Sequence, residues 1–216
     1  METNQFLSNL LAAKNNLFDM GTGSPEKWKS VETDLFEIAK LNSNLTCWPS
    51  DLELDKMNGL VALVESNNKL KHEFIKLQRP IEFDMAKPNL DAIQRKHNVQ
   101  FDVVRTSRTL KFLRWESIKF LYQHIYESVD RGTDVIVFVQ PGPDTDKLLK
   151  LNDDDPMLKK IIDDGYSFKD PTKLAAILEE IGFIGRTEFD VDRTLSEHPD
   201  GSKTVLKGRL MHFQKS

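Results

Sequence analysis

The sequence contains almost no cysteine. Its single thiol, Cys47, excludes an intrachain disulfide and also a zinc site built from cysteine pairs. Long apolar runs are missing as well, because no stretch approaches the roughly 18 apolar residues that a membrane span requires. The first residues lack the basic-then-apolar pattern of a secretion signal. These absences predict an intracellular, cytoplasmic protein with no membrane partner.

The chain also lacks an excess of positive charge. Its 30 Lys and Arg are outnumbered by 34 Asp and Glu, which gives a net charge of −4. A general polyanion-binding protein is usually basic over the whole domain, so the sequence argues against that class. Basic side chains outnumber acidic ones only within residues 79–133, and an anionic partner is expected to meet this middle segment.

Familiar catalytic motifs are missing too. The chain has no Gly-x-Ser-x-Gly elbow, no Walker A ending and no twelve-residue calcium loop. The acidic turn after residues 134–139 contains Asp144 and Asp146, whose carboxylates are weak candidates for binding Mg²⁺. An ordinary Pro-Gly turn explains these residues better. The sequence therefore predicts no bound metal and no cofactor.

Helical patterns dominate the first third of the chain. Apolar residues recur at helical spacing over residues 6–18, and Gly21-Thr22-Gly23 is interpreted as a helix stop. Two further helices are predicted over residues 24–38 and 51–78. Three helices with short connections predict an antiparallel bundle over residues 1–79.

The rest of the chain mixes two kinds of pattern. Residues 80–98 are predicted to form a linker with a short helix, and residues 99–216 an α+β domain that ends in a β-hairpin. The expected elements are strands at 99–104, 134–139, 186–191 and 204–213 and helices at 108–130 and 171–181. The predicted fold class is α+β, with an N-terminal antiparallel helical bundle followed by a small mixed sheet of about four strands with packed helices. A winged-helix arrangement of the last helix and hairpin is kept as an alternative.

The helix predicted at 108–130 has two distinct faces. A wheel that starts at residue 108 places apolar residues on one arc and a mixture of basic and aromatic residues on the other. Such a surface suits phosphates and unpaired bases, and it also suits a protein partner. A third interpretation is that the bundle covers it as interdomain core. The candidate partner- or nucleic-acid-binding residues are Arg105, Arg108, Lys111, Trp115, Lys119, Tyr122 and Tyr126.

These features favour a protein without enzymatic activity. The function they favour is a non-enzymatic binding or assembly protein, of the kind found among viral or phage accessory proteins, with another protein as its partner and an oligomeric state that stays open. A nucleic-acid-binding protein that prefers single strands is the alternative. A metal-dependent enzyme centred on Asp144 and Asp146 is a third hypothesis.

Overall fold

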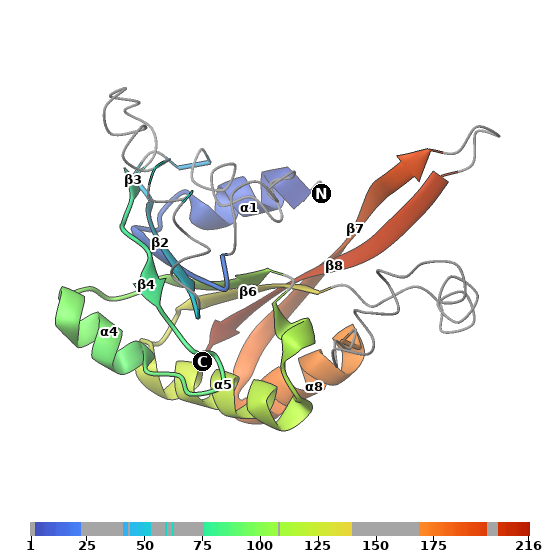
Figure 1. The fold of residues 1–216 in the computed structure, drawn as a ribbon. Helices are drawn as coiled ribbons and strands as arrows, with labels where there is room; N and C mark the ends of the chain where they lie inside the picture. The colour runs from blue at the N-terminus through green and yellow to red at the C-terminus, as the bar shows by residue number, and fades with distance from the viewer. Residues whose placement is uncertain are drawn as a thin grey trace.

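The computed structural model describes residues 3–22, 41–42, 44–52, 59, 62, 76–107, 109–139, 169–197 and 203–216. An eight-stranded sheet forms the centre of the molecule, with helices on both faces (Figure 1). The helices are α1 (Thr3–Leu11), α4 (Leu90–His97), the 3-10 turn η3 (Leu110–Phe112), α5 (Trp115–Ser128) and α8 (Pro171–Ile181). The strands are β1 (Asn16–Met20), β2 (Thr46–Asp51), β3 (Lys76–Leu77), β4 (Ile81–Glu82), β5 (Val103–Ser107), β6 (Asp134–Val139), β7 (Phe183–Glu197) and β8 (Lys203–Lys215).

The order of the strands is β3-β2-β1-β5-β6-β8-β7, and β4 pairs with β2 beyond β3. Strands β1 to β6 pair in parallel, whereas β8 is antiparallel to both of its neighbours, β6 and β7. From β1 the sheet grows through β2 in one direction and through β5 in the other. The order of the strands therefore reverses between β1 and β5, and such a switch point is where open α/β sheets bind ligands.

Both faces of the sheet are covered. On one face α4, α5 and α8 enclose a core that includes Phe18, Val104 and Val137 (Figure 1). On the other face Leu7 and Leu11 of α1 pack on the neighbouring strands. Because successive side chains of a strand alternate between faces, a strand covered on both sides is apolar along its whole length. Every residue of β6 is buried, which fits this rule.

The predicted fold class is wrong. The segment expected to form a helical bundle contains β1, β2 and β3, and β1 pairs directly with β5 in one mostly parallel sheet. The apolar spacing over residues 6–18 merged a short helix, α1, with the strand that follows it. Leu17 and Phe18 belong to opposite faces of the sheet and not to one helical stripe. The helix predicted at 24–38 and most of that at 51–78 lie outside the described residues.

Several local predictions are confirmed. The strand at 134–139 and the helix at 171–181 have the expected bounds, and α4 is the short helix predicted within residues 80–98. The side chain of Asp170 caps α8 by accepting a hydrogen bond of 2.8 Å from the Thr172 N–H, and Gly182 ends the helix in the left-handed conformation. The C-terminal hairpin is present, although its strands are longer than predicted.

The helix predicted at 108–130 is shorter than expected. Residues 110–112 form a 3-10 turn, and α5 begins only at Trp115. Residues 110–113 lie outside α5 and do not share its faces, so the buried face of α5 consists of Ile118, Leu121, Tyr122 and Ile125 at helical spacing. Tyr122 is fully buried, and its hydroxyl lies 3.0 Å from that of Thr106 on β5. Burial raises the pKa of the Tyr122 hydroxyl and outweighs the opposing effect of the Thr106 hydrogen bond.

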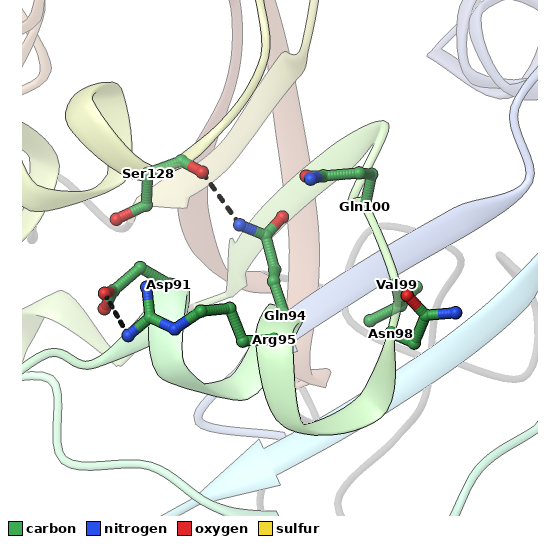
Figure 2. Close-up of a pocket in the computed structure, with 7 residues that line it drawn as sticks. All are labelled: Asp91, Gln94, Arg95, Asn98, Val99, Gln100 and Ser128. Carbon is green, nitrogen blue, oxygen red and sulfur yellow. Dashed lines mark hydrogen bonds and ion pairs between the residues drawn. The ribbon is translucent and has the colours of Figure 1, made fainter.

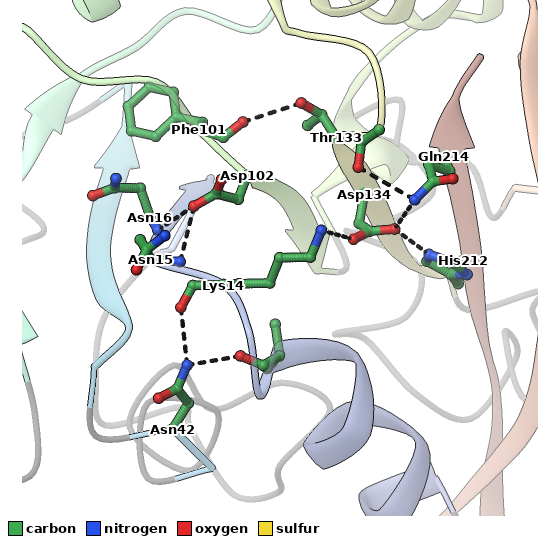
Figure 3. A network of polar contacts seen from close by, with 12 residues as sticks. Lys14, Asn15, Asn16, Asn42, Phe101, Asp102, Thr133, Asp134, His212 and Gln214 are labelled. Atoms are coloured by element: carbon green, nitrogen blue, oxygen red, sulfur yellow. Dashed lines mark hydrogen bonds and ion pairs between the residues drawn. The ribbon is translucent and has the colours of Figure 1, made fainter.

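A polar network closes the amino-terminal edge of the sheet (Figure 3). The buried carboxylate of Asp134 forms an ion pair with Lys14 and a hydrogen bond of 2.8 Å with Nε2 of His212. Nearby, Asp102 accepts hydrogen bonds from the backbone N–H groups of Asn15 and Asn16 at 2.8 and 2.9 Å. These contacts join the segment after α1 to β1, β6 and β8 at this edge of the sheet.

Asp134 should make stability depend on acid pH. Burial raises the pKa of this carboxyl, but the hydrogen bonds from His212 and Lys14 outweigh burial and hold the pKa below its usual value. The contribution to stability, on the order of 1 kcal/mol, is complete above pH ~5 and is lost as the pH falls below about 4. Urea unfolding between pH 6 and 3 should show a weaker pH dependence for Asp134→Asn than for the unmodified chain. Asp130→Asn, which changes an exposed carboxyl four residues earlier, is the control; an equal change in both variants would contradict this assignment.

Candidate functional site

The candidate site lies at the switch point, where β1 and β5 end side by side. β1 leads into Met20-Gly21-Thr22, and β5 leads through Ser107 toward Thr109. The carboxyl ends of parallel strands present loop backbone and polar side chains to a common ligand position. Two loops are thus brought to one edge of the sheet, opposite the network around Asp134.

Gly21 allows these two loops to meet closely. Its φ of +69° is a conformation that residues with a side chain rarely adopt. A Cβ atom at this position would lie 2.4 Å from Cγ2 of Thr109, much closer than van der Waals contact permits. The Thr109 hydroxyl donates to the carbonyl of Met20 at 3.4 Å. The loop after β1 is therefore held against the segment after β5 by a contact that only glycine fits.

Thr22 ties the same loop to β2 on the other side. Its hydroxyl donates to Oδ2 of Asp19 at 2.8 Å and accepts from the backbone N–H of Ser50 at 3.1 Å. The Thr22 N–H donates to the Ser50 carbonyl at 2.8 Å, and the Ser50 hydroxyl donates to the Asp19 carbonyl at 2.8 Å. Four hydrogen bonds thus fix the first turn of the loop before any ligand is bound.

A buried ion pair lies beneath the loop. Asp19 and Arg105 are each 1% exposed, they are register partners on β1 and β5, and their side chains form a salt bridge. One carboxylate oxygen binds the guanidinium while the other accepts from Thr22. The adjacent Cys47 thiol has a raised pKa, first because of burial and second because of the Asp19 charge. The thiol is therefore protonated and chemically inert.

The end of β2 adds a carboxylate and an apolar side chain to this edge. Asp51, the last residue of β2, is half-buried, and its backbone pairs with Glu82 of β4. Leu52 follows with 55% of its surface exposed. A glycine turn, fixed hydroxyls, a carboxylate and an exposed apolar side chain suit a ligand with hydroxyl groups and an apolar ring, as a nucleoside has.

The predicted binding residues are divided between the interior and the surface. Arg105 is buried in the ion pair with Asp19, and Tyr122 is buried against Thr106. Both were expected at the surface, and that expectation is corrected: Arg105 is buried in the sheet, and Tyr122 lies on the buried face of α5 with Ile118, Leu121 and Ile125. The other candidate residues of the predicted helix were assigned to its basic and aromatic face by the same helical wheel.

The other candidates differ in their surroundings. Lys119 is exposed and forms an ion pair of 2.6 Å with Glu180, Lys111 is half-buried, and Tyr126 is half-buried with its ring centroid 5.1 Å from that of Phe183. Trp115 is half-buried at the start of α5. Contact of this face with a partner stays a prediction.

Arg108, Asp144 and Asp146 lie outside the described residues. Within the residues that the structure does describe, no group of three His, Cys, Asp or Glu side chains could hold a metal ion. No helix of that part is long and apolar enough to cross a membrane.

A hollow of about 340 Å³ lies at the opposite edge of the sheet, between the ends of α4 and α5 (Figure 2). Gln94 spans it by donating to the Ser128 carbonyl at 2.8 Å and accepting from the Phe101 N–H at 3.2 Å. Arg95 is neutralised by Asp91 at 2.8 Å. Because these polar groups satisfy one another, the hollow lacks the directed chemistry of the switch-point edge.

The sequence signal for the switch-point site was present but was misinterpreted. Gly21-Thr22-Gly23 follows a short apolar segment, and a Gly-x-Gly after a strand is typical of nucleotide-binding loops. The third glycine of the full dinucleotide pattern is absent, since Glu26 occupies that position. Once the preceding segment was interpreted as helix, the glycines could only predict a helix stop.

Solved structures that include several methyltransferases are similar to this fold. An O-methyltransferase family protein of Burkholderia thailandensis matches 99% of this chain with a TM-score of 0.62 at 12% identity, and the chain spans only 55% of that protein's length. A Bacillus halodurans protein provisionally described as a methyltransferase matches with a TM-score of 0.63 at 14% identity, covering 99% of this chain and 98% of its own. Magnesium protoporphyrin IX methyltransferase from Synechocystis, solved with bound S-adenosylmethionine (SAM), matches with a TM-score of 0.58 at 14% identity over 99% of this chain and 76% of its own.

No protein-family model and no curated protein sequence matches the chain. The identities to the solved structures are low, so the likeness establishes the fold: a mostly parallel Rossmann-like sheet flanked by helices. The three structures named above are described as methyltransferases, and this finding overturns the predicted non-enzymatic binding or assembly protein. The helical-bundle and viral accessory interpretations are corrected on the same grounds.

Gly21→Ala should destabilise the chain more than glycine conformation alone explains. Gly132 also has a positive φ, +85°, but a Cβ there would meet nothing within 4 Å. Gly132→Ala therefore measures backbone strain alone, and Gly21→Ala should cost about 1–3 kcal/mol more because of the contact with Thr109. Adding Thr109→Ser to Gly21→Ala removes the methyl group that clashes, and it should recover part of the additional loss of unfolding free energy. Equal losses in the two alanine variants, measured by urea unfolding, would show that the loops do not approach each other this closely.

The salt bridge beneath the loop should behave as a coupled pair. Arg105→Met leaves the Asp19 carboxylate buried without its guanidinium and should cost about 3–5 kcal/mol of unfolding free energy. Combining it with Asp19→Asn should recover more than half of that loss, because the buried charge is removed. A double-mutant cycle measures this coupling. Additive effects of the two substitutions would contradict a direct interaction.

Proposed function

We propose that the chain is a SAM-dependent methyltransferase that binds its cofactor at the carboxyl ends of β1, β2 and β5. The observation that carries this proposal is the loop Met20-Gly21-Thr22 at the switch point. Gly21 approaches Thr109 so closely that a Cβ atom would clash, and Thr22 is hydrogen-bonded to Asp19 of β1 and to Ser50 of β2. The strand order, with β8 antiparallel between β6 and β7, is that of a fold whose solved examples include a methyltransferase with bound SAM.

The residues present fit such a cofactor. Gly21 carries no side chain over the turn after β1, and Asp51 places a carboxylate at the end of β2. In nucleotide-binding sheets an acidic residue beyond the neighbouring strand accepts hydrogen bonds from ribose hydroxyls, a role that Asp51 would take here. Leu52 supplies exposed apolar surface beside it. When bound, SAM supplies an activated methyl group to a nucleophilic atom of the acceptor.

The chain's own contribution is to hold the cofactor loop in place. Asp19, fixed by Arg105 on one side, holds the Thr22 hydroxyl on the other. The loop therefore loses little conformational freedom on binding, and preorganisation of this kind increases affinity. Thr109 presses on Gly21 from the β5 side, which links the cofactor loop to the segment that leads into α5. A ligand seated on this loop lies next to the loops after β5, where a second substrate can approach.

The test is binding of SAM and of its demethylated product, S-adenosylhomocysteine. Either ligand should raise the thermal midpoint in a concentration-dependent manner, since a ligand that binds only the folded state stabilises it. Asp51→Asn should weaken the affinity about tenfold in calorimetric titrations, because it removes a charged hydrogen-bond acceptor. Glu82→Gln, which changes the exposed register partner of Asp51 on β4, is the matched control and should leave the affinity unchanged. Absence of binding by both ligands at millimolar concentration would refute the proposal.

A further inference from the structure

Two lysines meet one tryptophan at the start of α5. The ammonium group of Lys173 lies 4.6 Å from the centroid of the Trp115 ring, and that of Lys169 lies 5.2 Å from it. Lys173 is exposed, whereas Lys169 is only 3% exposed. We call these three residues the Trp115 cluster. Both distances lie within the range in which a cation is attracted to an indole face.

The cluster lies at the functional edge of the sheet. Trp115 opens α5, which follows the carboxyl end of β5, and Lys169 and Lys173 flank the start of α8, which follows β6 in the chain. The two helices run in the same direction, and their N-terminal ends lie together on the side toward which β6 points (Figure 1). Thr109, which touches the cofactor loop at Gly21, stands six residues before Trp115. The cluster is therefore placed where an acceptor would approach a cofactor bound on the loop after β1.

The cluster concentrates positive charge. Burial, followed by the nearby charge of Lys173, lowers the pKa of Lys169, so the two cations act on each other. The start of α5 adds the partial positive charge of a helix N-terminus, whereas that of α8 is already capped by the Asp170 carboxylate. Lys119, one turn further along α5, forms an ion pair with Glu180 at 2.6 Å. An anion beside Lys173 would meet favourable charge from several sources at once.

We propose that the Trp115 cluster binds the anionic group of the methyl acceptor, so that the substrate carries a carboxylate or a phosphate close to the methylated atom. This inference rests on the proposed methyltransferase function. Lys173 contacts the anion directly, Trp115 positions the lysine through its ring face, and Lys169 reinforces the charge from within. Neutral acceptors gain none of this interaction.

The test uses small probes observed by saturation-transfer NMR on the full chain. Phenyl phosphate and benzoate should bind, whereas benzyl alcohol, which has the same ring and no charge, should bind at least fivefold more weakly. Lys173→Gln should weaken phenyl phosphate about fivefold, and Lys173→Arg should retain its affinity because the charge is kept. Preference for phenyl phosphate over benzoate identifies a phosphate-bearing acceptor, and the reverse identifies a carboxylate.

The matched control is Lys119→Gln on the same helix. It should leave probe binding unchanged, because that lysine is paired with Glu180. Equal binding of benzyl alcohol, or an equal loss in Lys119→Gln and Lys173→Gln, overturns the inference. Binding of SAM is measured separately in each variant. If the unmodified chain does not bind SAM, the methyltransferase proposal is refuted. If it binds SAM but shows no preference for anionic probes, only the proposed class of acceptor is refuted.

Discussion

The salt bridge between Asp19 and Arg105 is the interaction on which the rest of the arrangement depends. Removing two charges from water is costly, and a buried pair often contributes little net stability. Here its value is geometric. It joins β1 to β5 at the position where the order of the strands reverses, and the free oxygen of Asp19 holds Thr22. The loop that would receive a cofactor is therefore built on the interior of the sheet.

The two edges of the sheet have different tasks. At the amino-terminal edge, Asp134 binds Lys14 and His212, and Asp102 binds the backbone of Asn15 and Asn16, so the segment between α1 and β1 is tied to β6 and β8. At the carboxyl-terminal edge the buried groups are paired as well, but they support a glycine turn and the ends of β2 and β5. The polar groups of the first edge bind one another, whereas the second edge carries the groups placed to bind a ligand. This division is expected when parallel strands all direct their carboxyl ends to the same side.

Local signals predicted some elements well. β6 could be predicted because its β-branched run is typical of a strand covered on both faces, and α8 because Asp170, Pro171 and Gly182 mark its ends. β1 could not, because five residues that alternate between two cores resemble a continued helical stripe when they follow α1. Pairing in a parallel sheet joins segments far apart in the chain, and no pattern within either segment records it.

The site was harder to predict than the fold. Arg105 was selected as a basic residue, but its role depends on facing Asp19 across two strands, 86 residues apart. Tyr122 was assigned to the surface because the apolar face of the helical wheel included residues 110–113, which lie before α5 begins. Gly21 was noticed as a break in the pattern, although its meaning depends on Thr109, which lies beyond β5. The errors at Arg105 and Gly21 arose because the decisive neighbour was distant in sequence.

We have proposed that the loop after β1 binds SAM. The most direct measurement is the change of backbone amide chemical shifts when SAM is added to isotopically labelled protein. The largest changes are expected at Gly21, Thr22 and Asp51, with little change at the hollow between Asp91 and Ser128. Changes centred on that hollow, with the amides of Gly21 and Thr22 unaffected, would contradict the account.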